Sequence, residues 1–341
     1  MRAFVLTRHG GPEAQEWRTD WPDPVAGPGE VLVRVGATGL NNTDIWTREG
    51  RYAASDDPAA THGWRGVPLA FPRIQGADVC GRIVAVGTGV PATRIGERVL
   101  VNPVVYGAEG DGLDDYDFLG SERDGGFADL VAVPAANAVA IDSSLSDAEL
   151  ATFPTAYLTA EHMLARARVA AGERVLVTGA SGGVGSALVQ LAALRGATVI
   201  AMVGPGKEAA ARDLGAARVV PRDTADLSAA LGGVVDVAAD VVGGAGFPGV
   251  LAALRPGGRY VTAGAIAGPH VALDLRTLYL KHLDLIGSTL GTREEFLAIA
   301  GHIAAGRLRP LLAGSYSLAD LPRAQTDFLQ KRFFGKLVVV S

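Results

Sequence analysis

Short apolar runs separated by turn residues dominate the first 140 residues of the chain. Runs rich in β-branched residues occupy 31–35, 82–86, 98–101 and 130–133, and Gly or Pro residues bound them. Such runs are typical of strands, and together they predict a small irregular β-barrel. The pattern changes at Ser146, because a glutamate three residues later indicates the reciprocal cap of a starting helix.

A different hydrophobic pattern begins at Arg174, where apolar strand candidates recur about every twenty residues. Helical patterns lie between the early candidates, and Val184, Leu188 and Leu191 are spaced to share one face. Six strands that alternate with crossovers predict a parallel, doubly wound sheet, and thus an α/β fold class. The strand candidates are 175–178, 198–203, 219–220, 234–242, 260–263 and 283–286.

The tail of the chain returns to a helical pattern after residue 293 and ends in an apolar run at 336–340. We expect this last strand to rejoin the first domain. The predicted domains are therefore 1–145 together with 293–341, and 146–292.

Composition narrows the class of protein. The 341 residues are 48% hydrophobic and 20% charged, which is too apolar for a disordered chain. A formal charge of −5 gives no positive field to attract nucleic acid or an anionic membrane. Because Cys80 is the single cysteine, an intrachain disulfide and a cysteine-based structural zinc site are excluded. We interpret Cys80 as a small, buried hydrophobic residue.

Neither export nor membrane insertion is expected from the sequence. The first residues turn polar too soon for a signal peptide. The longest apolar region, 234–254, is interrupted by Asp236 and Asp240, whereas a membrane span needs about 20 apolar residues. We expect a cytoplasmic protein that acts on a small molecule and binds neither nucleic acid nor membrane.

A glycine-rich loop follows the strand candidate at 175–178 and precedes a helical pattern. Glycines allow a tight turn and a close approach of backbone N–H groups to a pyrophosphate, and the helix N-terminus adds partial positive charge. This arrangement predicts a dinucleotide site. Its residues are Gly179, Ala180, Ser181, Gly182, Gly183 and Val184, with Gly185 beyond them.

The segment after the next strand candidate bears on the choice of nucleotide. An NAD-selective site usually carries an acidic residue there, about 20 residues past the glycines. This chain has Gly204 and Lys207 and no carboxylate between them. A lysine can pair with a 2′-phosphate, so the sequence favours NADP(H) over NAD(H), although Lys207 also fits an ordinary surface lysine in a first helical turn.

Several blocks, in this order, resemble the medium-chain dehydrogenase/reductase superfamily over the whole chain, and within it the zinc-free quinone oxidoreductase branch. The resemblance implies a GroES-like β-barrel domain and a Rossmann domain. The blocks are 39–44 (Gly-Leu-Asn-Asn-Thr-Asp), 76–81 (Gly-Ala-Asp-Val-Cys-Gly), 155–160 (Thr-Ala-Tyr-Leu-Thr-Ala), the glycine loop, 287–291 (Gly-Ser-Thr-Leu-Gly) and 335–338 (Gly-Lys-Leu-Val).

Departures from the family pattern concern zinc. The family's zinc alcohol dehydrogenases carry a Cys where this chain has Asn41 and a His where it has Ala77. The stretch that would correspond to their structural-zinc lobe, 104–126, contains no Cys. Asn and Ala supply neither thiolate nor imidazole, so we expect no zinc. Without a Lewis acid, a conjugated acceptor is favoured, since hydride addition spreads the negative charge over an enolate or hydroquinone anion.

Matched positions imply roles for four residues near the reaction. Asn41 resembles the family asparagine beside the nicotinamide, able to hold cofactor or substrate oxygen. Thr43 corresponds to a relay residue of zinc members and is a candidate proton donor. Asp44 either belongs to this site or caps a helix that begins at Ile45. Tyr52 is either a phenol near the substrate or a partly exposed aromatic.

Further cofactor positions come from the resemblance alone, and they are Thr159, Val242, Gly264, Ala265, Leu290, Gly291 and Lys336. An insertion at 53–72, which contains His62, Trp64, Arg65 and Phe71, either borders the substrate cleft or is a plain surface loop. The remaining histidines are not spaced like metal ligands, and we interpret them as structural residues. They are His162, His282 and His302.

The leading hypothesis is an NADPH-dependent reductase of quinones or α,β-unsaturated carbonyls that works without zinc. Two alternatives stay open. One is a zinc-free carbonyl or alcohol dehydrogenase, or a pathway enzyme that has reused the cleft for a non-redox step such as cyclisation. The other is a cofactor-bound protein without catalysis. The family habit also suggests a homodimer joined near residues 283–290, because an exposed sheet edge offers unpaired backbone groups.

Overall fold

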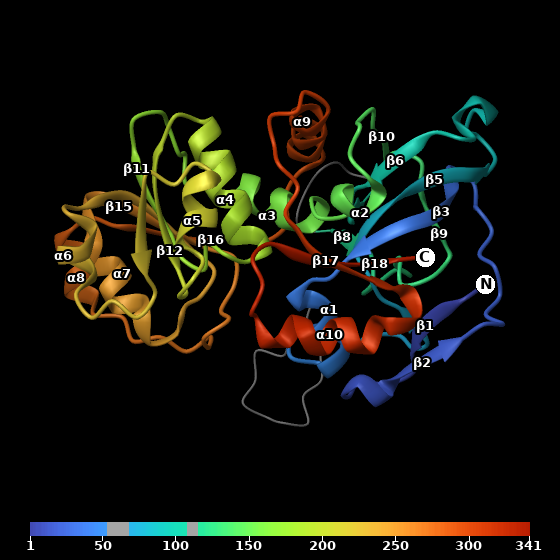
Figure 1. The fold of residues 1–341 in the computed structure, drawn as a ribbon, viewed down its shortest axis with the longest axis horizontal. Helices are drawn as coiled ribbons and strands as arrows, with labels where there is room; N and C mark the ends of the chain where they lie inside the picture. Colours follow the sequence, from blue (N-terminus) through green and yellow to red (C-terminus); the bar gives the residue numbers. More distant parts are fainter. Residues whose placement is uncertain (53–67, 108–114) are drawn as a thin grey trace. The chain divides into compact units, whose positions relative to one another are not determined.

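Two sheets organise the chain, and they belong to two separate units of the computed structural model (Figure 1). The structure describes residues 1–52, 68–107 and 115–341. The first unit comprises Met1–Thr155, Thr292–Arg332 and Lys336–Ser341, and the second comprises Ala156–Gly291 and Phe333–Gly335. The first unit thus extends ten residues beyond the border that the sequence pattern placed after residue 145, and the helix start at Ser146 lies inside it.

The first unit is rich in strands, as the short apolar runs predicted, and its sheets are mostly antiparallel. A seven-stranded sheet has the order β10-β6-β5-β3-β18-β17, and β9 pairs with β3. Its strands and those of two small sheets are β1 (Ala3–Leu6), β2 (Gln15–Arg18), β3 (Glu30–Gly39), β4 (Arg73–Ile74), β5 (Asp78–Val86), β6 (Arg98–Val101), β7 (Val104–Tyr106), β8 (Tyr116–Phe118), β9 (Leu130–Pro134), β10 (Ala138–Ala140), β17 (Leu312–Ser317) and β18 (Lys336–Val340).

Alternation along β3 builds the core of this unit. Val31, Val33 and Val35 point to one side and pack with the buried faces of β5, β6 and β9, as expected for a strand whose side chains alternate between two faces. Cys80 lies fully buried in β5, which confirms its prediction as a small core residue, and burial raises the pKa of its thiol.

Helices of the first unit follow the predicted caps. Ser146 accepts a hydrogen bond from the Glu149 N–H (3.2 Å), and the Glu149 carboxylate accepts one from the Ser146 N–H (2.8 Å), which confirms the capping box. The helices are α1 (Asn42–Glu49), α2 (Asp147–Leu150), α9 (Arg293–Ala304) and α10 (Leu321–Gln330), while α3 (Pro154–Arg166) runs across the border between the units.

The second unit is a parallel sheet with strand order β13-β12-β11-β14-β15-β16, so the doubly wound prediction is confirmed. Every predicted strand of this region exists. β15 begins at Leu254, six residues before its predicted start, and the ends of the other five strands differ from the prediction by two residues at most. The elements are β11 (Arg174–Val177), α4 (Gly183–Leu194), β12 (Thr198–Val203), α5 (Glu208–Asp213), β13 (Arg218–Pro221), α6 (Leu227–Leu231), β14 (Val235–Asp240), α7 (Phe247–Ala253), β15 (Leu254–Thr262), α8 (Leu275–Leu280) and β16 (Asp284–Gly287).

All strands of this sheet run the same way, so their carboxyl ends meet at one edge. Ligands of doubly wound folds bind at this edge, where the strand order reverses. Here the reversal lies between β11 and β14, which are neighbours in the sheet although α4, β12, α5, β13 and α6 separate them in sequence. The glycine loop directly follows β11, so the fold places it at the reversal point.

The tail rejoins the first unit, as predicted. Val338 of β18 pairs with Gly39 of β3 in an antiparallel register. Strand β17, which pairs in parallel with β18, was not predicted, because its sequence Leu-Ala-Gly-Ser-Tyr-Ser lacks an apolar alternation. Among the helices that the structure describes, none has the length and apolar character needed to cross a membrane.

Candidate functional site

Helix α1 carries the residues predicted near the reaction. Asn41 precedes the helix in extended conformation, and Asp44 is its third residue. The Asp44 carboxylate accepts a hydrogen bond from the Asn41 backbone N–H at 2.7 Å. The helix therefore begins at Asn42 and not at Ile45, which corrects that expectation. Asp44 does act as a cap, from inside the first turn, and so fixes the entry of the chain at Asn41.

Asp44 is also nearly removed from solvent, with 4% of its surface exposed. Burial raises the pKa of its carboxyl to about 7, the hydrogen bond from Asn41 lowers it, and the neighbouring Asp78 raises it further. A buried carboxylate costs free energy unless it is compensated. The site therefore holds one acid that changes charge near neutral pH.

A buried ion pair lies beside Asn41. The Lys336 ammonium donates to the Asn41 Oδ1 at 2.7 Å and to the Asp78 carboxylate. The other Asp78 oxygen accepts from the Thr155 N–H at 2.7 Å. Asp78 is fully buried and Lys336 is 3% exposed. Lys336, predicted to contact the cofactor, thus directs its charge toward Asn41 and Asp78 in this structure.

Strand register brings these residues together. Gly39 of β3 lies opposite Asp78 of β5 and Val338 of β18. A Cβ atom at position 39 would lie 2.3 Å from the Ala151 carbonyl oxygen and 3.1 Å from an Asp78 carboxylate oxygen. Glycine is therefore required at this point for the Asp78 side chain to occupy its place.

Thr43 and Tyr52 form a second pair on α1 and the residues after it. Their side chains share a hydrogen bond, and burial raises the pKa of the Tyr52 phenol. The Tyr52 ring meets the Trp46 ring edge-on, with centroids 5.7 Å apart. Two hydroxyl groups in contact can pass a proton from one to the other, so the structure brings both predicted donor candidates together.

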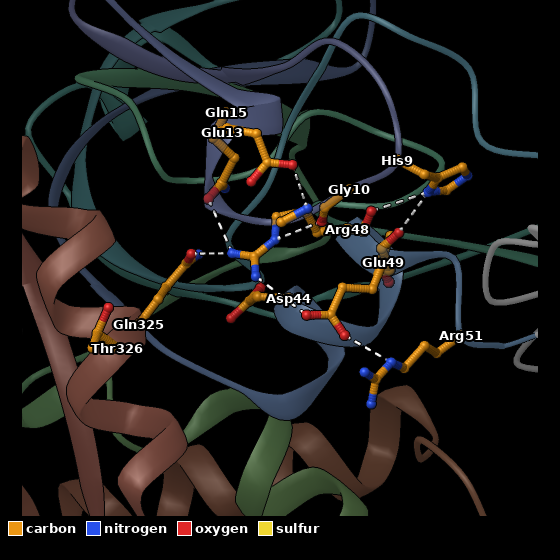
Figure 2. Close-up of polar contacts among 12 residues, drawn as sticks. His9, Gly10, Glu13, Gln15, Asp44, Arg48, Glu49, Arg51, Gln325 and Thr326 are labelled. Carbon is orange, nitrogen blue, oxygen red and sulfur yellow. Dashed lines mark hydrogen bonds and ion pairs between the residues drawn. The ribbon is translucent and has the colours of Figure 1, made fainter.

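Arg48 anchors α1 from the opposite end (Figure 2). It is almost fully buried, and its guanidinium donates to the Gln325 side chain of α10, to the Gly10 carbonyl at 3.2 Å and to the Gln15 Oε1 at 3.4 Å. Burial lowers the pKa of this guanidinium. The N–H groups of a buried guanidinium each need a hydrogen-bond acceptor, because burial without one costs free energy. Arg48 therefore couples the orientation of α1 to α10 and to the β1–β2 region.

Two glutamines close this network. Gln15 donates to the Gln75 Oε1 at 3.2 Å, and Gln75 donates to the Asp44 backbone carbonyl at 2.9 Å. The helix is therefore held at both ends by buried polar groups, which rigidify a site when they are satisfied. The sequence analysis did not single out Arg48, Gln15 or Gln75, because their partners are distant along the chain.

In the second unit, the glycine loop forms a tight turn directly against the start of α4. Gly179 has a φ of 57°, which favours glycine. A Cβ atom at Gly185 would lie 2.2 Å from the Gly179 carbonyl oxygen, so the helix packs directly on the turn. The N-cap of α4, Gly182, has no side chain to bond the free N–H groups of the first turn. These groups fit an anion.

Asp240 fixes the segment that faces this loop. Its buried carboxylate accepts hydrogen bonds from the Thr178 hydroxyl (2.5 Å), the Tyr260 hydroxyl (2.6 Å) and the N–H groups of Val242 (2.8 Å) and Gly243. A Cβ atom at Gly179 would lie 3.0 Å from the Val242 side chain. Val242 is thus held beside the loop, and its contact with a cofactor stays a prediction.

Gly264 and Ala265 lie in the same neighbourhood. They follow β15, and ideal Cβ positions place Gly264 next to Val241 and Ala265 next to Gly243. Gly204 and Lys207 follow β12 at the same edge of the sheet, and Leu290 and Gly291 follow β16. Thr159 is buried in α3. For all of these residues, contact with a cofactor stays a prediction.

Arg222 joins Lys207 at the carboxyl ends of β12 and β13. The Arg222 N–H donates to the Val203 carbonyl at 2.9 Å, and its guanidinium lies 3.7 Å from an ideal Cβ on Gly204. Partial burial and the charge of Arg222 both lower the pKa of Lys207. Two cations thus share one small region. The sequence analysis missed Arg222, because only the pairing of β12 with β13 brings it there.

Other predicted residues are placed as follows. His62, Trp64 and Arg65 lie outside the described residues. Phe71 is described, and its ring meets the His9 ring edge-on at 4.9 Å between centroids. His162 lies in α3 and His302 in α9. Within the described ranges, no group of three or more His, Cys, Asp or Glu side chains could hold a metal ion.

Comparison with known proteins gives two matching family models. The alcohol dehydrogenase GroES-like domain matches residues 27–143, and the zinc-binding dehydrogenase domain matches residues 183–305. Together they cover parts of both units.

Relatives match the full length of the chain. A quinone oxidoreductase of Mus musculus is 30% identical, with 96% of this chain and 94% of the relative covered. An acryloyl-coenzyme A reductase of Metallosphaera sedula is 29% identical over all of both chains. A solved structure from Sinorhizobium meliloti 1021, provisionally assigned as an alcohol dehydrogenase, is 55% identical with a TM-score of 0.97 and covers 100% of this chain and 96% of its own.

Charge on Asp44 predicts a pH effect on stability. Its pKa of about 7 in the folded protein exceeds that of an unfolded aspartate. The folded state then binds more protons than the unfolded state between about pH 4 and 7, so this group lowers stability as the pH rises through that range. Asp44→Asn should remove a loss of up to about 4 kcal/mol, and its free energy of unfolding relative to wild type should be higher at pH 8 than at pH 5.

Urea denaturation at both pH values measures this difference. Asp274→Asn is the control, because Asp274 caps α8 at the surface, and hydrogen bonds from Arg276 lower the pKa of its carboxyl. Between pH 5 and pH 8 the control variant should follow the pH profile of wild type, because the Asp274 carboxyl is ionised in both the folded and the unfolded state over that range. Equal pH profiles for Asp44→Asn and wild type would contradict the assignment.

Proposed function

Because the chain belongs to the medium-chain dehydrogenase/reductase superfamily and is an oxidoreductase, we propose that it reduces a conjugated acceptor with NADPH and without zinc. The acceptor is a quinone or an α,β-unsaturated carbonyl compound. NADPH supplies the hydride when it is bound. The observation that carries the proposal is the Lys336 ammonium on Asn41, at the position where zinc members of the family have a cysteine.

The donor set around this position supports chemistry without zinc. Asn41 offers an amide, and Ala77, at the place of the family histidine, offers no ligand and is fully buried. Zinc in proteins is bound by thiolate, imidazole or carboxylate groups. An ammonium 2.7 Å from the Asn41 oxygen also opposes a second cation there. The domain that is named for zinc binding matches residues 183–305, whereas both positions lie in the GroES-like match at 27–143.

A conjugated acceptor suits the groups that remain. Hydride addition to the β-carbon of an enone places negative charge on the carbonyl oxygen, and one or two hydrogen-bond donors can stabilise that charge. Asn41 offers an amide donor in the first unit, and Thr43 and Tyr52 offer hydroxyl groups on the same helix and the residues after it. The names of the quinone oxidoreductase and acryloyl-coenzyme A reductase relatives agree with such acceptors.

The choice of NADPH rests on Lys207 and Arg222. Two neighbouring cations repel each other, and a phosphate between them would relieve this repulsion and accept hydrogen bonds from both. No carboxylate stands at 203–207 to exclude a 2′-phosphate. The glycine loop and the first turn of α4 supply the N–H groups for the pyrophosphate.

A homodimer is part of the proposal. Strand β16 lies at the end of the parallel sheet, and Leu285 on it is 39% exposed. Large apolar side chains of α8 next to it, Leu275, Tyr279 and Leu280, are also exposed. A second copy could pair with this edge and cover these side chains. The same edge was expected from the family habit.

Activity is tested directly with a panel of 2-cyclohexen-1-one, 1,4-benzoquinone and cyclohexanone, following the absorbance of NADPH. We expect oxidation of NADPH with the first two acceptors and little with cyclohexanone, because only conjugated acceptors delocalise the added charge. Treatment with EDTA followed by gel filtration should leave the rate unchanged. Loss of the rate with EDTA and its return with Zn²⁺ would contradict the zinc-free reaction, and inactivity toward a broad panel would contradict the function.

Cofactor preference is tested by binding. Arg222→Ala and Lys207→Ala should each weaken NADPH binding by about ten- to a hundredfold, the worth of a charge-assisted hydrogen bond, and leave NADH binding nearly unchanged. Protein fluorescence titration measures both dissociation constants. Arg212→Ala, which removes an exposed arginine of α5, is the matched control. Equal losses for both nucleotides, or tighter binding of NADH by wild type, would contradict this assignment.

Oligomeric state is tested at the sheet edge. Leu285→Lys should convert a dimer into a monomer, because a charged side chain on an edge strand opposes pairing with a second copy. Sedimentation velocity of wild type and variant measures the change. Leu297→Lys on the exposed face of α9 should leave the dimer intact. A wild-type monomer would contradict the proposal.

A further inference from the structure

The orientation of the Asn41 amide follows from its neighbours. An ammonium group only donates hydrogen bonds, so the atom 2.7 Å from Lys336 must be the amide oxygen. The reverse orientation would place two donors in contact beside a positive charge. The assignment of O and N, often ambiguous for an asparagine, is thereby fixed by chemistry.

Lys336 cannot turn away from this role. Its other partner, Asp78, is fully buried, and both oxygens of that carboxylate are engaged, one by Lys336 and one by the Thr155 N–H. The strand register of β3, β5 and β18 holds the three backbones in place. Moving the ammonium would leave a buried, unpaired charge, which costs several kcal/mol.

The amide nitrogen of Asn41 is left to face a ligand. Among contacts between described residues, Nδ2 makes one long contact of 3.4 Å with the Gly39 carbonyl oxygen. Asn41 is partly exposed, unlike Asp78 and Lys336. A charge-assisted bond at its oxygen also polarises the amide and strengthens its N–H groups as donors.

We propose that Lys336, held by Asp78, is a positioning residue that locks Asn41 with its NH₂ group outward, so that Asn41 acts as a hydrogen-bond donor to a ligand oxygen. This inference rests on the proposed function for the identity of the ligand. The ligand oxygen belongs either to the carbonyl of the acceptor, which gains negative charge on hydride addition, or to the cofactor. Both are hydrogen-bond acceptors, and the experiment separates them.

Two variants test the lock. Lys336→Gln combined with Asp78→Asn keeps the volumes and the acceptor for Thr155, removes both charges and lets the Asn41 amide turn over. Lys336→Arg retains a donor cation and is the matched control. Thermal unfolding of each variant reports whether the fold is retained, and steady-state kinetics with 2-cyclohexen-1-one together with NADPH titration report the effect.

For an acceptor oxygen, the double variant should lose tenfold or more in kcat, with the KM for the enone and the Kd for NADPH changed by less than about threefold. For a cofactor oxygen, the Kd for NADPH should rise by a similar factor instead. The Lys336→Arg variant should keep most of the wild-type kcat and NADPH affinity in either case. A folded double variant with wild-type kcat, KM and Kd would overturn the proposal.

If the double variant fails to fold, a spectroscopic measurement replaces the kinetic test, and it requires no catalytic turnover. The carbonyl ¹³C resonance of labelled cyclohexanone, bound to the protein with NADP⁺, moves downfield when its oxygen accepts a hydrogen bond. The shift in wild type should be lost in Asn41→Leu for an acceptor oxygen, and a weaker NADP⁺ affinity of that variant marks a cofactor oxygen. Unchanged shift and unchanged affinity would overturn the proposal, whereas inactive wild type toward all acceptors would overturn only the proposed function.

Discussion

One buried ion pair, between Lys336 and Asp78, organises the first unit around its candidate site. Two charges taken out of water are tolerated only when each is fully bonded, and here the carboxylate and the ammonium together engage Asn41 and Thr155. The pair therefore joins the start of β5, the start of β18, the residue before α1 and the second residue of α3. Four distant segments depend on one electrostatic requirement.

The second unit also contains a buried carboxylate, but no cation among the described residues stabilises it. Asp240 is as deeply buried as Asp78, but hydroxyl and backbone N–H groups satisfy its carboxylate. Neutral donors fix the segment after β14. The cations Lys207 and Arg222 stand elsewhere, after β12 and β13. In each unit a buried aspartate thus joins segments of the candidate site, Asp78 with a cation as partner and Asp240 with neutral donors.

Local patterns made much of this predictable. Strand rhythm and the glycine loop depend on neighbours within about twenty residues, and the parallel sheet, the cap at Ser146 and the return of the tail were all predicted. Contacts that depend on strand register were not predicted. Lys336 and Asp78 are 258 residues apart, and Arg222 reaches Lys207 only through the pairing of β12 with β13. The partners of Arg48 come from the β1–β2 region and from α10. No pattern in the sequence near these residues marks their partners.

The place of β18 has a consequence for biosynthesis. This strand pairs with β3, yet it occupies the last residues of the chain. A nascent chain can close the parallel sheet before β18 is made, since β11 to β16 all precede it. The barrel, although its first strands are translated earliest, has to wait with an open edge until β18 has been translated. Premature stops would therefore release a finished Rossmann domain tethered to an unfinished partner, a species prone to aggregate through that edge.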